Sequence, residues 1–434
     1  MNYCKKYNII NKMCCVLSFF FHSYKAFGAQ DLLDFVTASL KNNLSIRSEK
    51  YAVAASKSAV KSEEGRYKPR IDFELLGSQT KNWEPEREPI NALDFSVSVV
   101  QALYDPSISA GSNFAEAKSV EAKMAKNLAE QKLILQTTNH YISYIERTEK
   151  VADIRGQMSF IKEHIKIVRE KRKLWSLNNV DVQMAEARQS KMNYDLIDAK
   201  SELQQLKLLL ESISGLRPQA PLRRLSIKLQ DIHLKFAPEI STNHPEALVL
   251  NSQVQSEYAV QKLARSKFYP KLDSFASIES NRRSEGRKWY SFGIRLTYNL
   301  YEGGQSTARL QEVAHTLSAK KFNYQKYINE VSHKLKKSII TYHSSGDKIK
   351  ILKQSIEMHK QILLSRSQQF KSGSVSIADV LNAQEDLFKV QRQIAKAERN
   401  IIQSSIDLLA ISGRLNLSEL KKVVHLGEVV GEDY

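Results

Sequence analysis

Residues able to do chemistry are few in this chain, and they form no known catalytic motif. The 434 residues contain no P-loop, no HExxH zinc-protease pattern and no GxSxG nucleophile elbow. The ten histidines are scattered, and we expect His333 and His343, which share one helix, to be solvated. The three cysteines, Cys4, Cys14 and Cys15, all stand near the amino terminus. The sequence therefore predicts no enzyme, no cofactor and no metal site.

The most regular pattern of polar residues lies in one stretch, Lys288–Gly304. Apolar side chains occupy every second position, namely Tyr290, Phe292, Ile294, Leu296, Tyr298 and Leu300. Polar residues stand between them, including Ser291, Arg295, Thr297 and Asn299. A period of two predicts a strand with one apolar face and one polar face. A half-buried strand of a soluble sheet fits this pattern, and so does a membrane strand, which needs about 9–11 residues.

If the strand crosses a membrane, its two faces have different surroundings. We expect the apolar side chains Phe292, Ile294 and Leu296 to face lipid. We expect the polar side chains to face a lumen, and these are Ser291, Arg295, Thr297 and Asn299.

The amino terminus has the features of a secretory signal peptide. Lysines precede a short apolar run, Met13–Phe21, and the small-residue site Ala26-Phe27-Gly28 follows it. The apolar run is too short for a membrane-spanning helix, which takes about 20 residues. We therefore expect residues 1–28 to be removed by cleavage near Gly28–Ala29. Neither the 42% hydrophobic content nor the mean hydropathy of −0.41 is typical of a polytopic helical membrane protein.

The chain is strongly basic, with a formal net charge of +18. Such a balance is compatible with nucleic-acid binding. The basic residues are spread along expected helices and alternate with Glu, Asp and Gln, so we interpret them as a solvated helical surface and predict no nucleic-acid partner.

The sequence contains a tandem duplication. Five short blocks recur about 200 residues later with a nearly constant offset, as internal repeats do. The pairs are Asn42–Leu44 with Asn243–Pro245, Tyr67–Asp72 with Phe268–Asp273, Leu103–Asp105 with Leu300–Glu302, Val180–Val182 with Ala378–Val380, and Ile213–Gly215 with Ile411–Gly413. We therefore expect two equivalent halves.

Each half is predicted to contain a helix, two strands and a long helical hairpin. The first repeat, residues 29–215, has strands near 70–80 and 92–103 and a hairpin over 107–215. A proline-containing linker, residues 216–241, leads to the second repeat, residues 242–415, with strands near 271–280 and 289–301 and a hairpin over 305–413. Residues 416–434 form a carboxy-terminal tail. The returning helices carry heptads of apolar residues, which predict coiled-coil packing.

Membrane strands must close into a barrel, because lipid leaves an unpaired strand edge unsatisfied. Four strands are too few for this, since about eight are needed merely to enclose side chains. The predicted fold is therefore mainly α, with long coiled-coil helices and four strands per protomer. The strands must then be pooled with those of further copies. A trimer would give a shared twelve-stranded β-barrel, enough for an open lumen, and the helices would prolong it as an α-helical tube.

Two segments resemble the TolC family of outer-membrane efflux and secretion channels. They are Leu300–Gly304, at the strand-to-helix turn, and Phe370–Gln384, which is similar to the family's helix-tip signature. The resemblance covers essentially the whole mature chain. It implies a homotrimer in the Gram-negative outer membrane that extends into the periplasm. It also implies a periplasmic adaptor protein docked on an inner-membrane efflux transporter or an ABC secretion ATPase.

The resemblance implies roles for the helical tips. The adaptor-binding positions would be Leu174, Trp175 and Ser176 in the first half and Phe370, Gly373 and Ser374 in the second. Asp181 and Asp379 match the aspartates of the family's pore constriction, although both aspartates are also suited to capping the returning helices. This sequence departs from the family at Trp175, Phe370 and Val375, which replace a glycine and the polar pair that closes the tip. The tip is then expected to close by apolar contact or to be looser.

The expected function is a passive exit duct for drug efflux or type I protein secretion. The alternatives are a periplasmic coiled-coil adaptor and a soluble coiled-coil scaffold. Both alternatives explain long helices, but neither explains four amphipathic strands.

Overall fold

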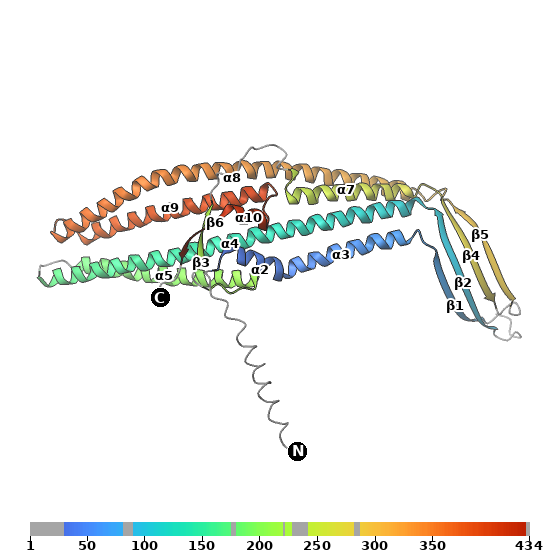
Figure 1. Ribbon diagram of the computed structural model, residues 1–434, viewed down its shortest axis with the longest axis horizontal. Coiled ribbons are helices and arrows are strands. Elements are labelled where there is room, and N and C mark those ends of the chain that lie inside the picture. Colours follow the sequence, from blue (N-terminus) through green and yellow to red (C-terminus); the bar gives the residue numbers. More distant parts are fainter. Residues whose placement is uncertain are drawn as a thin grey trace, which may run out of the picture.

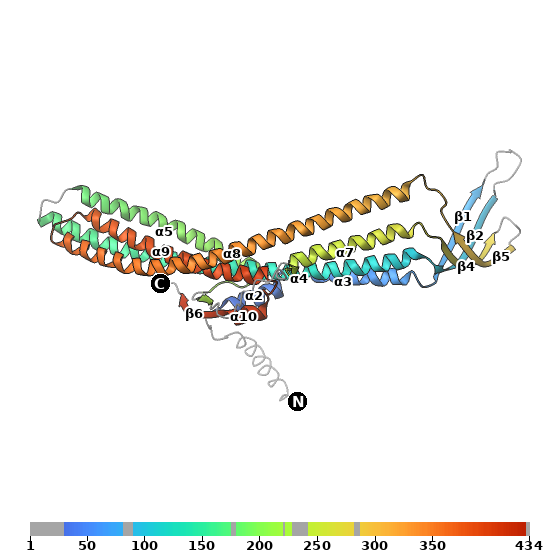
Figure 2. The same ribbon diagram turned by 90° about the horizontal axis from the view of Figure 1, so that it is seen from above.

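The computed structural model describes residues 30–80, 90–174, 179–219, 222–227, 242–281 and 287–430. Over these ranges the chain forms a long helical rod with a four-stranded sheet at one end (Figure 1, Figure 2). The expected leader, residues 1–28, lies outside the described residues.

Apart from α2, which stands only in the first repeat as described, the two repeats have the same order of elements. The first contains α2 (Leu32–Asn42), α3 (Leu44–Gly65), β1 (Arg70–Thr80), β2 (Ile90–Tyr104), α4 (Pro106–Leu174) and α5 (Asn179–Ser214). The second contains α7 (Pro245–Ser266), β4 (Lys271–Asn281), β5 (Arg287–Thr297), α8 (Gln305–Lys371) and α9 (Ile377–Ile411). The expected fold class, mainly helical with a small sheet, is confirmed.

The four strands form one antiparallel sheet in the order β1-β2-β4-β5. The pairing of β2 with β4 joins the two repeats. β5 ends at Thr297, four residues before the predicted end of this strand at Tyr301. The physical reason is that Lys271, the first residue of β4, is the partner of Thr297, so residues beyond Thr297 have no partner on β4.

The helices lie in layers across the rod. α8 forms one edge, α9 and α7 follow one another beneath it, α4 comes next, and α5 and α3 form the opposite edge (Figure 1). α4 has 69 residues and α8 has 67. At 1.5 Å rise per residue each is about 100 Å long, so each spans both the sheet half and the tip half of the rod.

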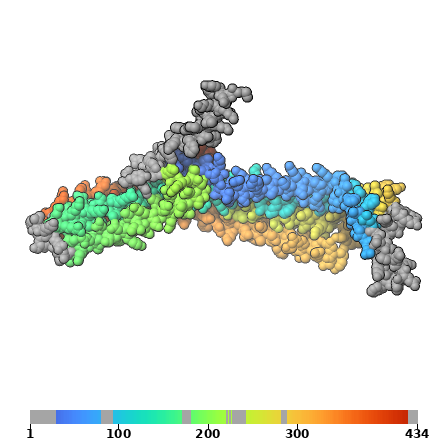
Figure 3. Space-filling model, turned by 90° about the horizontal axis from the view of Figure 1, so that it is seen from below, coloured from blue at the N-terminus to red at the C-terminus, as the bar shows by residue number. Residues whose placement is uncertain are grey.

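The shorter helices meet end to end at the middle of the rod, in the same way in both repeats. The α5 end at Gly215 meets Asn42, before α3, and the α9 end at Gly413 meets Asn243, before α7. In the space-filling view the surface of α5 (green) is continued along the rod by the blue surface of α2 and α3 (Figure 3). Both glycines have positive φ, +70° and +71°, which lets each helix end sharply against the next.

The helices that begin at these junctions are capped by equivalent residues. The Asn43 side chain accepts a hydrogen bond from Ser45 N at 2.9 Å, and His244 Nδ1 accepts one from Glu246 N at 3.1 Å. Burial lowers the pKa of His244, so the imidazole is neutral and keeps the acceptor that the cap needs. The Tyr327 hydroxyl lies 2.9 Å from the same nitrogen and donates to Glu246 Oε2 at 3.1 Å, which ties α8 to this cap.

Segments outside the repeats build a further unit at the middle of the rod. The expected linker contains β3 (Leu222–Ile227), and the expected tail contains α10 (Leu417–Val423) and β6 (Val424–Val430). β3 and β6 pair antiparallel. Buried residues of α2, β3 and α10, including Phe35, Leu222 and Leu420, share one apolar core with α4, α5 and α9. The start of the first repeat, the linker and the tail therefore pack together at the middle of the rod.

We predict that Gly413→Ala destabilises the protein more than Gly215→Ala. Both changes place a side chain at positive φ, which costs roughly 1–2 kcal/mol. At Gly413 the new Cβ would also overlap the carbonyl oxygen of Asn243, whereas at Gly215 it would lie 3.3 Å from the Asn42 amide, which can move. The measurement is the denaturant midpoint of the purified protein.

The matched control is Gly346→Ala in α8, where no atom lies within 4 Å of the new Cβ. This change should be neutral or stabilise the helix by about 0.5–1 kcal/mol. Equal midpoints for Gly413→Ala and Gly346→Ala would contradict the proposed helix junction.

Candidate functional site

The register of the sheet gives it two chemically different faces. Residues directly opposite each other in an antiparallel pair point to the same side. One face carries Ile71, Phe73, Leu75, Leu93, Phe95, Val97, Val99, Ala276, Ile278, Tyr290, Phe292, Ile294 and Leu296. The other face carries Asp72, Glu74, Asp94, Ser96, Ser98, Asp273, Ser277, Glu279, Ser291, Arg295 and Thr297.

The apolar face is left uncovered by the rest of the described chain. Phe292 is 81% exposed, Ile294 and Leu296 are each 67% exposed, and Phe73 on the other edge strand is 68% exposed. A contiguous apolar surface of this kind marks contact with a membrane or with another protein. The polar face, by contrast, has internal hydrogen bonds such as the 2.8 Å contact between the hydroxyls of Ser277 and Ser291.

The structure places the predicted residues of β5 on two opposite faces, with one exception. Asn299 lies beyond the end of β5, so the period-two assignment does not extend to it. Its side chain donates to the Glu302 carboxylate, which also accepts from the Ser306 hydroxyl at the start of α8. Asn299 therefore belongs to the strand-to-helix turn rather than to a strand face.

The sheet and the helical rod have open edges on the same two sides. β1 and β5 are the outer strands of the sheet, with one neighbour each within the described chain. β1 follows α3 and β5 precedes α8, which are the edge helices of the rod (Figure 1). These edge helices and α5 also expose large apolar side chains, among them Tyr51, Tyr194, Ile197, Ile340, Ile351 and Met358.

At the far end of the rod, the returning helix of the second hairpin begins with a capping box, in which Ser376 is the N-cap and Asp379 is the third helical residue. Its carboxylate accepts from Ser376 N at 3.0 Å and from the Ser376 hydroxyl at 2.7 Å, and Asp379 N donates back to Ser376 Oγ at 3.3 Å. The hydrogen bonds from Ser376 lower the pKa of Asp379, so the carboxylate is charged at neutral pH. Asp181 lies in the first turn of α5.

The tip residues expected to bind an adaptor fall into three groups. Gly373, with φ +81°, and Ser374 form the exposed turn between α8 and α9. Phe370 is only 4% exposed, so its ring packs inside the rod and does not stand on the surface. Leu174 is the last residue of α4, and Trp175 and Ser176 lie outside the described residues.

Phe370 belongs to an apolar cluster that joins the two hairpins. Its buried members are Ile161, Ile165, Val168, Val182, Ala185, Met192, Phe370, Ile377, Val380 and Leu381, and Val375 packs against them. Near this cluster an ion pair between Arg188 and Glu385 connects α5 to α9. A second ion pair, Arg169–Glu186 at 2.6 Å, connects α4 to α5. Within one protomer the tip is therefore held mainly by apolar contact.

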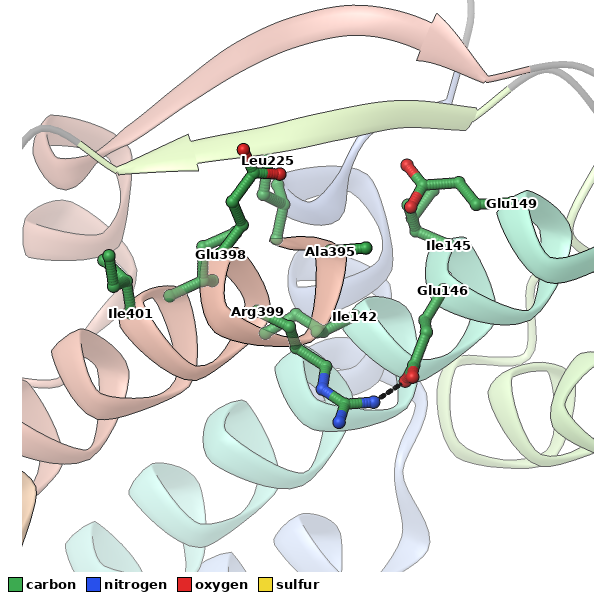
Figure 4. A pocket seen from close by; sticks show the side chains of 10 residues that line it. Ile142, Ile145, Glu146, Glu149, Leu225, Ala395, Glu398, Arg399 and Ile401 are labelled. Atoms are coloured by element: carbon green, nitrogen blue, oxygen red, sulfur yellow. Dashed lines mark ion pairs between the residues drawn. The ribbon is translucent and has the colours of Figure 1, made fainter. Parts of the chain in front are cut away.

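A cavity of about 320 Å³ lies at the middle of the rod, between α4, α9 and the β3–β6 ribbon (Figure 4). An ion pair joins Glu146 of α4 to Arg399 of α9, and Leu225 of β3 contributes to the wall. Glu149 and Glu398 point toward the ribbon (Figure 4). The ion pair links the two repeats, so we interpret the cavity as part of a structural junction.

The remaining side chains offer little chemistry. Among the residues described, no three His, Cys, Asp or Glu side chains are grouped so as to hold a metal ion. Across the same ranges, no helix is both long enough and apolar enough to cross a membrane.

Comparison with known proteins identifies relatives across most of the chain. Residues 238–414 match the family "Outer membrane efflux protein". Outer membrane protein TolC of Vibrio cholerae is 20% identical over 416 residues, 91% of this chain and 93% of that protein. Alkaline protease secretion protein AprF of Pseudomonas aeruginosa is 20% identical over 200 residues, which cover 45% of this chain and 40% of that protein. None of these names describes an enzyme.

The fold agrees with that of solved outer-membrane channels. The Campylobacter jejuni CmeC outer membrane channel superposes with a TM-score of 0.79 at 15% identity, over 90% of this chain and 88% of that one. The match includes both the sheet and the helical rod, because it spans nearly the whole described structure. The chain therefore matches the outer membrane efflux protein family over residues 238–414, and its fold is that of the solved outer-membrane channels.

Proposed function

We propose that three copies of this chain form a passive exit duct through the outer membrane. The observation that carries this proposal is the sheet itself, which has one exposed apolar face, one polar face and two open edges. An amphipathic sheet of this kind suits a barrel with lipid outside and water inside. A coiled-coil adaptor or scaffold would not require such a sheet.

The open edges support a ring of copies. The β1 side of one protomer is also its α3 and α5 side, and the β5 side is also its α8 side. Joining the first side of one copy to the second side of the next satisfies the strand edges and covers the exposed apolar residues of α5 and α8 in one step. Three copies of four strands give twelve strands, enough for an open lumen.

The partners follow from the position of the tips. The turn at Gly373 and Ser374 is exposed at the end farthest from the sheet, where a periplasmic adaptor protein would dock. We include Leu174, Trp175 and Ser176 of the first-half tip in this surface. The adaptor would couple the duct to an inner-membrane efflux transporter or to an ABC secretion ATPase. The relative named as a protease secretion protein makes secretion as plausible a use as efflux.

We propose that the closed tip is held mainly by apolar contacts rather than by polar ones. Phe370 and Val375 pack in the apolar cluster that joins the hairpins, and the Arg188–Glu385 ion pair adds a charged contact between α5 and α9. Opening the tip would then require the hairpins to expose apolar surface. We propose that adaptor binding compensates for that cost.

The lipid-facing assignment predicts a strong difference between two arginine substitutions. Ile294→Arg places a charge on the apolar face, where Arg costs roughly 2–4 kcal/mol at mid-bilayer. Ser291→Arg, three residues away on the polar face, should cost much less, and so should Thr297→Arg. The measurement is the yield of heat-modifiable trimers in outer-membrane fractions. Equal yields for Ile294→Arg and Ser291→Arg would refute the assignment of faces.

The pore role proposed for the tip aspartates predicts an electrical effect without a loss of stability. The amide oxygen of Asn can still accept the hydrogen bond that Ser376 N donates to Asp379, so Asp379→Asn with Asp181→Asn should leave trimer stability nearly unchanged. If both aspartates ring the pore, the double variant should lose cation preference, seen as a shift of the reversal potential under a salt gradient in planar bilayers. An unchanged reversal potential would show that the two residues serve only as helix caps.

A further inference from the structure

We propose that Arg295 and Phe275 form a binding site for organic anions on the polar face of the sheet. Aromatic carboxylates or sulfonates would bind at this site as they pass through the duct. The inference rests on the proposed function, because it requires that this face line a water-filled barrel. It adds the class of substrate, which the family alone does not give.

Phe275 lies on the mainly polar face, which also carries Leu76, Val100 and Trp289. The neighbouring strand β5 has a glycine directly opposite the ring. This glycine is Gly293, the cross-strand partner of Phe275. A Cβ at Gly293 would lie 3.2 Å from both Cε1 and Cζ of the ring, so the ring covers the glycine. Glycine in a strand covered by a cross-strand aromatic is a stabilising arrangement. Phe275 is therefore held against the wall rather than extended into the lumen.

Arg295 lies over this ring. Its Cζ is 4.9 Å from the centroid of Phe275, within the range of a cation–π contact. Asp273 is the direct cross-strand partner of Arg295. Nevertheless, among the described residues no carboxylate lies within ion-pair distance of the Arg295 guanidinium. The guanidinium thus stacks on the ring and keeps its charge without a carboxylate partner.

Unlike Arg295, the neighbouring basic residues of this face have carboxylate partners. Arg70 pairs with Asp72 at 2.7 Å, and Lys271 pairs with Asp105 at 3.5 Å. Their charges are compensated locally, whereas that of exposed Arg295 is available to a passing solute. In three copies, three such guanidinium groups would stand at one height of the barrel.

The chemistry of the pair defines the ligand. A planar guanidinium presents parallel N–H donors that match the oxygens of a carboxylate or a sulfonate. The adjacent Phe275 side chain is partly exposed and offers the edge of its ring to an aromatic group. An anion attached to an aromatic ring would engage both residues, while an aliphatic cation would engage neither.

The test uses the full-length trimer in planar bilayers, with 1-naphthalenesulfonate added from the sheet side as the probe. We expect it to block the wild-type current, and Arg295→Gln to raise the half-blocking concentration about tenfold, the scale of one charge-assisted hydrogen bond. Phe275→Leu should raise it about threefold, the scale of an exposed ring contact. Arg295→Lys, which keeps the charge but not the planar fork, should fall between wild type and Arg295→Gln.

Two controls separate the possible failures. Thr297→Gln, on the same strand and face, should leave the block unchanged, and naphthalenemethanol, the neutral analogue, should block neither wild type nor variants. Wild-type channels without block, or equal block in wild type and Arg295→Gln, would overturn the proposal. If Arg295→Gln forms no channels, equal block in wild type, Phe275→Leu and Arg295→Lys overturns it instead. A wild-type protein that forms no channel at all would overturn the proposed duct itself.

Discussion

The structure depends on the need to satisfy the backbone groups at the edges of the four-stranded sheet. In the proposed duct the sheet lies in lipid, where no water would hydrogen-bond the free N–H and C=O groups of β1 and β5. Four strands are too few to close into a barrel, so the proposal pairs these edges with further copies of the chain. The long helices continue the same two sides, since α3 and α5 lie on the β1 side and α8 lies on the β5 side. The proposed ring of copies would therefore satisfy the strand edges and cover the exposed helical edges together.

The tandem duplication explains how one chain supplies both the four strands and the two long helices. Each repeat contributes two strands, one helix of nearly 70 residues and two shorter helices that meet end to end, and the first repeat adds α2. The junctions use Gly215 and Gly413 at positive φ, next to Asn42 and Asn243. The two repeats are then joined by the β2–β4 pairing at one end, by the β3–β6 ribbon at the middle and by the apolar cluster around Phe370 near the tip.

Much of this organisation could be predicted from the sequence, because it depends on periodic patterns. The alternation in β5 correctly separated Ile294 from Arg295, and the repeat located the second pair of strands. The limits of prediction have physical causes. Asn299 was placed on a strand face because the pattern continues past Thr297, although β4 offers no partner there. Phe370 matched a tip position in sequence but is buried by residues of other helices. The β3–β6 ribbon and the Phe275–Gly293 contact were missed because short strands and cross-strand neighbours are defined by pairing, not by local pattern.

The most direct test of the account is cysteine accessibility along β5 in an open channel. Each residue from Ser291 to Thr297 is replaced singly by cysteine, in a chain whose own three cysteines all lie in the expected leader. A membrane-impermeant, cationic thiol reagent is then added during planar-bilayer recording. The account predicts that cysteines at 291, 295 and 297 react and change the current, while those at 292, 294 and 296 do not. Position 293 is left out of this comparison because the Phe275 ring covers it. Reaction at every position, or at the even-numbered positions alone, would contradict a barrel lined by the polar face of this sheet.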